Sequence, residues 1–350
     1  MERKSDIALM LLACPHTSNL RIIDTVRILT NMAFWQSQVW TRKADSLYDT
    51  ATQRDPDFMP WWREAIALWR RAPRYDVIVT MGVRESMLYG LLCALTLRRP
   101  KQIMCEVFID APRPTPSWHL KNCLYRFVAR RAIGLLANSS AEVHTIARRY
   151  RLDPARIRYV PLNTNIANPQ REPADDDYIL SAGRTLRDYA TLLNAVRQLP
   201  ELPTSVICGR NDFQGLEIPP HVQIFTEIPR ATYLEKLRRC RLVALPLLNT
   251  ERATGQVVML EAMAMGKPVI TTRSPGTVDH LVDGENGILI EPGDAPALAR
   301  EIERLWNNPA LRQRLGEAAV QTMRESASAD RHAELKLRAI AELNAQQKRH

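Results

Sequence analysis

One carboxylate, Glu261, stands within a largely apolar stretch that runs from Ala253 to Thr272, ATGQVVMLEAMAMGKPVITT. The pattern predicts a helix over Gly255–Met265, ended by Gly266 with Pro268 just beyond. A helix that is apolar on every face is normally buried, and a buried carboxylate is costly unless something hydrogen-bonds it. Glu261 is therefore expected either to bind a polar ligand or to form a structural ion pair with an arginine.

Two arginines follow a predicted strand in the segment SAGRTLRDYA, where Gly183 separates the strand from Arg184 and Arg187. Arginine suits bidentate contact with phosphate, and a fixed cation also stabilises negative charge that grows on a leaving phosphate. We expect Arg184 and Arg187 to bind such a group. The alternative is that both pair with nearby acids such as Asp188.

The start of the predicted helix is a third candidate, because a helix N-terminus presents unpaired N–H groups and a positive dipole end. Gly255 allows a ligand to approach the backbone closely. The residues concerned are Thr254, Gly255, Gln256 and Val257. In the simpler interpretation, Thr254 is an ordinary N-cap.

The elements that must position these residues alternate between strands and helices, which indicates parallel sheets. In the first half, strands are predicted at Ile7–Ala13, Tyr75–Thr80, Lys101–Ile109 and Ala132–Ala137, with helices at Leu20–Met32 and Ser86–Leu97. In the second half, strands are predicted at Tyr178–Ala182, Thr204–Cys208, Val222–Phe225, Leu242–Leu245 and Val269–Thr271, with helices at Tyr189–Gln198, Thr232–Arg239, Gly255–Met265 and Pro296–Asn307.

A polar, proline-bearing segment separates the two halves, so the 350 residues predict an α/β fold of two doubly wound Rossmann-like domains facing a central cleft. The expected boundaries are 1–165, a linker at 166–177, 178–330, and a helical tail at 331–350 that returns to the first domain. Ligands of such sheets bind at the carboxyl ends of the strands.

The N-terminal run Ile7–Cys14 resembles a short signal peptide, but it is brief and abuts Asp6, so a first strand is preferred. Six scattered cysteines without a CxxC pair favour reduced thiols and a cytoplasmic location. No window reaches the roughly 20 apolar residues of a membrane-spanning helix.

The net charge of +10 is unevenly distributed: residues 1–165 hold 25 Lys and Arg against 14 Asp and Glu, whereas the remainder is nearly neutral. This excess indicates either a solvated surface or an anionic partner, such as phospholipid headgroups or a lipid diphosphate. No nucleic-acid-binding motif accompanies it, so nucleic acid is not expected as a partner.

Four segments, in order, resemble the retaining family 4 glycosyltransferases, which are group 1 glycosyltransferase-like and adopt the glycosyltransferase-B fold. They are Ala137–Asn165, Ser181–Val196, the segment LVALPLLNTERATGQVVMLEAMAMGKPVITT, and Gly276–Asp294. The likeness is good over roughly residues 120 to 320 and poor over the first 100. It implies a nucleotide diphosphate sugar as co-substrate. Neither a cofactor nor a metal ion is expected, because no acidic metal motif appears and arginines can neutralise the diphosphate.

The resemblance also assigns roles in binding that donor. Glu261 matches the second of two family glutamates and would accept hydrogen bonds from the ribose hydroxyls. Arg184 and Arg187, the latter in place of the usual Lys, would bind the diphosphate. The first glutamate falls at Ala253 and is missing, which puts the contact with the transferred sugar in doubt; Glu251 lies two residues earlier.

The first half carries the candidates for the acceptor side, although the family's glycine-rich loop is missing there. His16, Glu106 and Asp110 are candidates for acceptor binding, and Asp110 also for proton handling. The predicted helix 117–131 combines Leu120, Leu124, Phe127 and Val128 with basic residues and the aromatics Trp118 and Tyr125. It is expected either to lie on an anionic membrane surface or to pack in the core.

The resemblance and the charge together predict a retaining glycosyltransferase, cytoplasmic or peripheral on the inner face of the plasma membrane. Its acceptor would be a saccharide, plausibly lipid-linked, in the synthesis of a bacterial surface polysaccharide. Two alternatives stay open: a non-catalytic subunit that binds nucleotide sugar or lipid carrier, and a nucleotide-sugar epimerase on the same fold.

Overall fold

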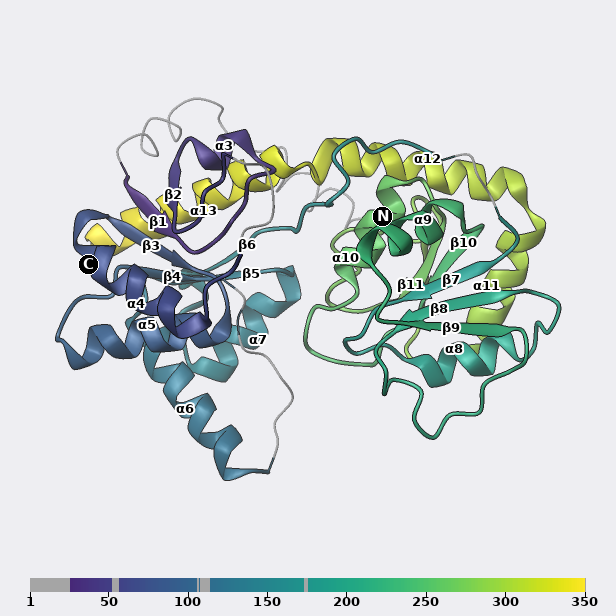
Figure 1. Ribbon diagram of the computed structural model, residues 1–350, viewed down its shortest axis with the longest axis horizontal. Coiled ribbons are helices and arrows are strands. Elements are labelled where there is room, and N and C mark those ends of the chain that lie inside the picture. The colour runs from purple at the N-terminus through teal and green to yellow at the C-terminus, as the bar shows by residue number, and fades with distance from the viewer. Residues whose placement is uncertain (1–25, 52–56, 106, 108–113, 173–175, 350) are drawn as a thin grey trace. The chain divides into compact units, whose positions relative to one another are not determined.

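The computed structural model describes residues 26–51, 57–105, 107, 114–172 and 176–349, and it contains two six-stranded parallel sheets (Figure 1). The first sheet has the order β2-β1-β3-β4-β5-β6 and the second β12-β11-β10-β7-β8-β9. In both sheets the order of the strands doubles back on the chain order. Helices connect many of the parallel neighbours, as is usual for crossovers between parallel strands.

The first sheet consists of β1 (Ile28–Thr30), β2 (Ala44–Ser46), β3 (Val77–Thr80), β4 (Gln102–Met104), β5 (Gly134–Ala137) and β6 (Ile157–Tyr159). Strands β1, β3, β4 and β5 are buried along their whole length, as expected for parallel strands covered on both faces. The helices of this part are α3 (Gln38–Thr41), α4 (Trp61–Arg71), α5 (Val83–Leu95), α6 (Pro116–Arg131) and α7 (Ser140–Tyr150).

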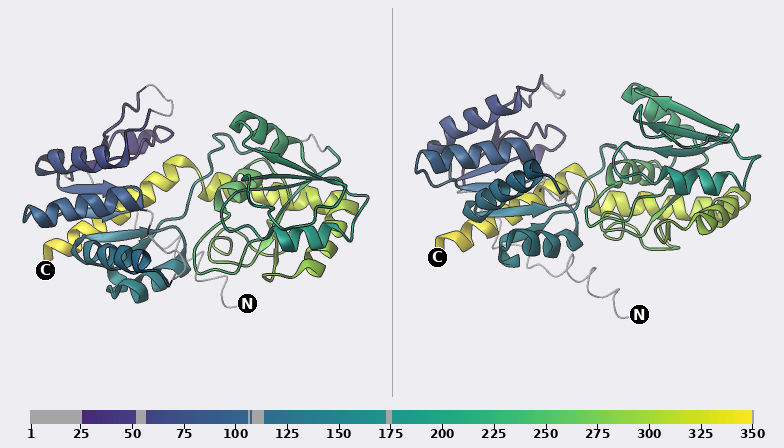
Figure 2. Two further views of the ribbon diagram at one scale, coloured as in Figure 1. Left: turned by 60° about the horizontal axis from the view of Figure 1, so that its bottom comes forward. Right: turned by 90° about the horizontal axis from the view of Figure 1, so that it is seen from below.

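The second sheet consists of β7 (Ile179–Ala182), β8 (Thr204–Cys208), β9 (Val222–Thr226), β10 (Leu242–Leu245), β11 (Val269–Thr272) and β12 (Ile288–Ile290). Its helices are α8 (Tyr189–Val196), α9 (Arg230–Arg239), α10 (Gln256–Ala264), α11 (Ala295–Asn307) and α12 (Pro309–Ser326). Figure 2 shows this sheet between two layers of helices.

Side chains of the second sheet alternate between two hydrophobic clusters because successive strand residues point to opposite faces. Ile179 and Leu242 pack with α8 and α11, whereas their neighbours Leu180 and Val243 pack with α9, α10 and α12. Both faces are thus covered, as in a doubly wound domain. The second cluster contains most of α10, which explains why that helix is apolar all round.

The chain forms two compact units: residues 1–105, 127–135 and 333–350 in the first, and residues 106–126 and 136–332 in the second. The last helix, α13 (Ala329–Arg349), therefore belongs largely to the first unit. Its buried side chains include Ala333, Leu337 and Ile340.

The α/β fold with two Rossmann-like sheets is confirmed, and all five strands predicted in the second half are present. The prediction of a helix over Leu20–Met32 is wrong at its end, because Ile28–Thr30 forms β1, paired with both β2 and β3. Three consecutive buried residues serve a central parallel strand, and tertiary pairing overrides the local pattern. The predicted strand Ile7–Ala13 lies outside the described residues.

Candidate functional site

Glu261 lies in the middle of α10 and is buried, with 1% of its surface exposed. Its Oε1 accepts hydrogen bonds from Nη2 of Arg230 at 2.7 Å and from Nδ2 of Asn165 at 3.2 Å, and its Oε2 accepts one from the hydroxyl of Tyr233 at 2.7 Å. The structural ion pair expected as one alternative is therefore present. A ligand hydroxyl that binds this carboxylate would share or replace one of these bonds.

Arg230 and Tyr233 both lie in the first turn of α9, three residues apart, so that they share one face of that helix. Burial and the Glu261 carboxylate raise the pKa of Tyr233 far above its usual range, which keeps its hydroxyl protonated as a donor. Sequence reasoning missed both residues. The signal for Arg230 was available, because a buried glutamate predicts an arginine somewhere in the fold.

Arg187 lies folded back over the loop that follows β7. Its Nε donates to the carbonyl oxygen of Ala182 at 2.8 Å, and its Nη1 donates to that of Thr185 at 2.9 Å. The guanidinium covers Gly183, where a Cβ atom would lie 2.2 Å from Nη2. Asp188 instead caps α8 by accepting from the backbone N–H of Thr191, so the alternative interpretation, in which Arg187 pairs with Asp188, is wrong.

Arg184 extends from the same loop toward solvent, with 61% of its side chain exposed. Its Nη2 lies 3.4 Å from Oε2 of Glu227, which is itself exposed. An exposed pair at this distance contributes little to stability. Arg184 is thus a cation that a ligand could recruit at small cost.

The N-terminus of α10 has no side-chain cap, and its N-cap residue is Gly255, with φ +79°. The interpretation of Thr254 as the N-cap is wrong, because its hydroxyl donates across to the carbonyl oxygen of Thr185 at 3.0 Å. Gln256 is buried and donates to the carbonyl oxygen of Asn138, whereas Val257 is half exposed. The Thr254–Thr185 bond joins the arginine loop to the start of the helix.

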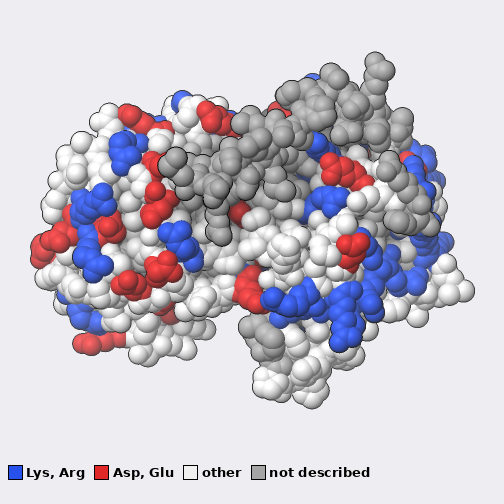
Figure 3. Space-filling model, turned by 180° about the vertical axis from the view of Figure 1, so that it is seen from behind, with Lys and Arg blue, Asp and Glu red and all other residues white. Residues whose placement is uncertain are grey.

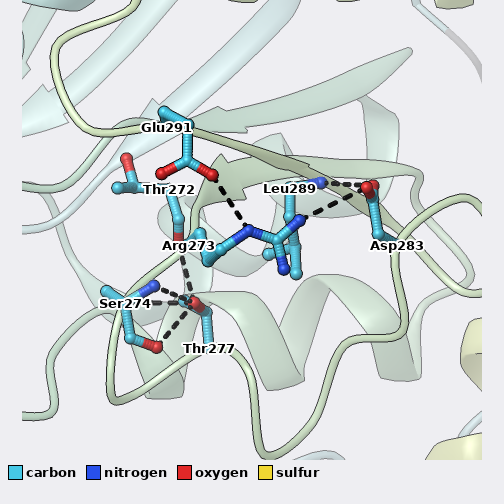
Figure 4. A network of polar contacts seen from close by, with 7 residues as sticks. All are labelled: Thr272, Arg273, Ser274, Thr277, Asp283, Leu289 and Glu291. Atoms are coloured by element: carbon cyan, nitrogen blue, oxygen red, sulfur yellow. Dashed lines mark hydrogen bonds and ion pairs between the residues drawn. The ribbon is translucent and has the colours of Figure 1, made fainter.

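The loop after β11 supports this helix start (Figure 4). Arg273 donates to Oε1 of Glu291 at 3.1 Å and lies 3.5 Å from Oδ2 of Asp283. The Thr277 hydroxyl donates to the carbonyl oxygen of Thr272 and accepts from the N–H of Ser274. These bonds fix the shape of the loop. The loop also passes close to the residues that precede α10, because a Cβ atom on Gly276 would lie 2.6 Å from the carbonyl oxygen of Thr254.

The position of the missing glutamate, Ala253, receives a carboxylate from another element. Its backbone N–H donates to Oε1 of Glu142, in the first turn of α7, at 2.7 Å. Glu251, the other candidate, instead pairs with Arg148 at 2.7 Å on the surface. Burial raises the pKa of Glu142, while its two backbone hydrogen bonds lower it.

Gly183, Arg184 and Arg187 thus follow the carboxyl end of β7, and Thr254, Gly255 and Gln256 belong to the loop and helix start that follow β10. These two strands are neighbours in the sheet, so the predicted residues meet at the carboxyl ends of the strands, where doubly wound sheets bind ligands. A surface pocket of about 380 Å³ beside β12 includes Asp283 and Glu291 but none of the predicted residues.

The acceptor-side candidates His16, Glu106 and Asp110 lie outside the described residues. Within the described part of the chain, no group of three or more His, Cys, Asp or Glu is placed to hold a metal ion. In α6, Leu120 and Phe127 are exposed, but Tyr125, expected as an interfacial aromatic, is fully buried. No helix among the described residues is long and apolar enough to cross a membrane.

Comparison with known proteins finds a likeness in the second half of the chain. Residues 163–322 match the family described as glycosyl transferases group 1. A lipopolysaccharide core biosynthesis glycosyltransferase, LpsE of Rhizobium meliloti, is 29% identical over 156 residues, 43% of this chain and 46% of the relative. The chain thus spans about half the length of that relative.

Two further likenesses extend over more of the chain. A D-inositol 3-phosphate glycosyltransferase of Pseudarthrobacter chlorophenolicus is 25% identical over 71% of this chain and 67% of its own length. The structure of Anabaena HepE in complex with UDP-glucose superposes with a TM-score of 0.68 at 16% identity, covering 93% of this chain and 99% of HepE. The fold is the two-domain α/β fold of the glycosyltransferase-B class.

Proposed function

We propose that this protein is a retaining glycosyltransferase that moves a sugar from a nucleotide diphosphate sugar to a saccharide or lipid-linked acceptor. The observation that carries the proposal is that a hydrogen bond from Thr254 to Thr185 joins the arginine loop after β7 to the uncapped start of α10, the helix that also contains the buried Glu261. The match to the group 1 family, over residues 163–322, includes all of these residues. HepE, which shares the fold, binds UDP-glucose.

Each part of this candidate site has a role in the proposed reaction. Arg184 and Arg187 bind the diphosphate, whose negative charge grows as its bond to the anomeric carbon breaks. The N–H groups that begin α10 at Gln256 and Val257 add a positive dipole end on the same side. Glu261 accepts from the ribose hydroxyls in exchange for part of its bonding to Arg230. No metal ion is required, because the two arginines neutralise the diphosphate.

The transfer itself needs no strong base in this proposal. The acceptor hydroxyl forms its bond to the anomeric carbon on the face that the diphosphate leaves, and its proton passes to the departing phosphate oxygen. Retention follows from this same-face geometry. Asp110, expected at the acceptor side, would orient the hydroxyl rather than remove its proton.

The proposed acceptor belongs to bacterial surface polysaccharide synthesis, in keeping with the role that LpsE's name states for that relative. A lipid-linked acceptor would place the protein on the inner face of the plasma membrane. In the view of the protein in Figure 3, Lys and Arg gather on the part of the surface formed by the first sheet and its helices, whereas positive and negative charges are interspersed on the rest. The basic helix α6 is one candidate for that contact.

Titration of the protein with UDP, GDP, ADP and TDP tests the donor site directly. We expect one nucleotide to bind in the micromolar range and to lose its affinity in Glu261→Gln and in Arg184→Ala. Arg238→Ala, which removes an exposed arginine that pairs with Glu235 on its own helix, is the matched control. Binding that is unchanged in both site variants would refute the donor-site assignment.

A non-catalytic nucleotide-sugar-binding subunit is the second candidate, favoured by Ala253 and by the Arg230 contact that already occupies Glu261. Release of free sugar or transfer from any bound donor would exclude it. Turnover of the donor to its epimer without an acceptor would instead support an epimerase.

A further inference from the structure

Two leucines at the end of α5 project into solvent. Leu95 is 81% exposed and Leu97 is 93% exposed, so that neither side chain is covered by the fold. Single exposed leucines are common on protein surfaces, but two within one helical turn form a small exposed apolar patch. Neither leucine gains stability by burial within its own unit.

Leu97 is also unfavourable in its backbone conformation. The N–H of Arg98 donates to the carbonyl oxygen of Cys93 at 2.8 Å, and the N–H of Leu97 donates to that of Ala94 at 3.2 Å. This is a Schellman closure, and it places Leu97 at the left-handed position, with φ +54°. Glycine is the usual residue there, because a side chain in this conformation is strained. A leucine that costs stability in this way and buries nothing points to a contact outside the chain.

The surroundings of these leucines are basic. Helix α4 lies beside α5 (Figure 1), and the two helix ends are tied together by Trp69 and Arg98. The Arg98 guanidinium lies 4.5 Å from the centre of the Trp69 ring, whose Nε1 donates to the Thr96 hydroxyl. Residues 69–75 and 94–101 contain no acid and six cations, namely Arg70, Arg71, Arg74, Arg98, Arg99 and Lys101.

We propose that this tip, residues 69–75 with 94–101, docks on an anionic phospholipid surface. The leucines insert among the acyl chains near the headgroups, and the arginines bind lipid phosphates, which is how mixed apolar and basic surfaces bind membranes. Two copies of the tip would not pair with each other, because the six cations of one copy would face the six cations of the other in a symmetric contact.

This inference rests on the proposed function only for its purpose, which is to keep the enzyme on the membrane that contains a lipid-linked acceptor. It differs from attachment through α6. The tip combines two leucines that are more than four-fifths exposed with six cations in its own two segments, whereas α6 buries Tyr125 and Val128 against the fold. Attachment through the tip and attachment through α6 involve different residues, so substitutions in one or the other distinguish the two modes of membrane binding.

Cosedimentation of the full chain with phosphatidylcholine vesicles, with and without phosphatidylglycerol, tests the proposal. We expect binding only to vesicles that contain phosphatidylglycerol. Leu97→Gly should lower this binding roughly ten-fold, because it removes an inserted side chain, while raising the melting temperature by relieving the strained backbone. Arg99→Glu should weaken binding further at low salt. Leu120→Ser, at an exposed position of α6, is the matched control and should bind like the parent.

A Leu95→Ser, Leu97→Gly variant that binds vesicles like the parent overturns the proposal, and so does loss of binding in Leu120→Ser alone. Concentration-dependent self-association that the double variant abolishes would assign the tip to a second copy instead. Nucleotide titration of the double variant should match the parent. Vesicle binding thereby tests the membrane-docking proposal, and nucleotide titration tests the proposed donor site independently.

Discussion

The carboxylate of Glu142 accepts a hydrogen bond from the backbone N–H of Ala253 at 2.7 Å, although the two residues stand 111 positions apart. The same carboxylate accepts from the N–H of Asn138 at 3.3 Å, so that it also completes the start of α7. The chain therefore has an acid beside position 253 although it has none at position 253. This acid holds the loop that leads into α10.

Removal of that acid should loosen the loop. Glu142→Ala leaves the Ala253 N–H without its partner, at a cost of about 1–3 kcal/mol in the free energy of unfolding. Donor turnover should fall more than this stability loss explains, because Thr254 and Gly255 follow directly. Glu142→Gln keeps an acceptor oxygen and should recover most of both quantities. Urea unfolding and kcat/KM for the donor measure the two effects, and equal behaviour of Ala and Gln variants would contradict this role.

Gly183 should be required for the position of Arg187. Its φ is +127°, and a methyl group there would meet the Arg187 guanidinium. Gly183→Ala is expected to displace that side chain and to lower nucleotide affinity roughly ten-fold, as the loss of a charge-assisted contact would. Gly215→Ala is the control, since Gly215 also has a positive φ but open space around its Cβ position. Similar nucleotide affinities of the two variants, measured by calorimetry, would rule out the steric argument.

The pair of Arg230 with Glu261 should stabilise the fold in the absence of donor. Arg230→Ala removes the charged partner of the buried Glu261 carboxylate and leaves it two neutral partners, Tyr233 and Asn165, so it should lower the free energy of unfolding by about 1–3 kcal/mol. Arg238→Ala, in an exposed pair on the same helix, should leave the melting temperature unchanged. If saturating nucleotide raises the melting temperature of Arg230→Ala by more than it raises that of the parent, Glu261 is a ligand-binding group. If nucleotide changes nothing, Glu261 is a structural ion.

His280 should make the protein sensitive to acid. Burial lowers its pKa to about 4 from the usual 6.5, and its Nε2 lies 3.4 Å from Nε2 of Gln256. Between these two values the unfolded chain binds more protons than the folded one, so stability falls as the pH drops from about 6.5 toward 4. The full shift corresponds to about 3 kcal/mol.

His280→Gln removes this proton uptake while keeping a polar side chain of similar reach. The difference in melting temperature between parent and variant should change across pH 7 to 4 and then level off. Circular dichroism melts at several pH values give this difference directly. Parallel curves for the two proteins would show that His280 does not carry the acid sensitivity.

The sequence by itself determined the second sheet and the burial of Glu261. Short apolar runs separated by amphipathic helices define parallel strands, and an all-round apolar helix has to be buried, so these features follow from local patterns. Ile28–Thr30 was assigned to a helix because nothing local marks it as a central strand. Its pairing with Ala44–Ser46 and Val77–Thr80 is decided by residues distant in the chain.

Only the tertiary structure decided how the site is held together. The Arg187 side chain, expected to extend toward a phosphate, bends back onto the carbonyl oxygens of Ala182 and Thr185. Arg230 and Glu142 reach the site from other helices, and no spacing rule connects them to α10. Hydrogen bonds between groups far apart in the chain depend on how the helices pack on the sheet. The sequence thus indicated the candidate residues of the site, whereas the packing of the helices on the sheet determined the hydrogen-bond partners of those residues.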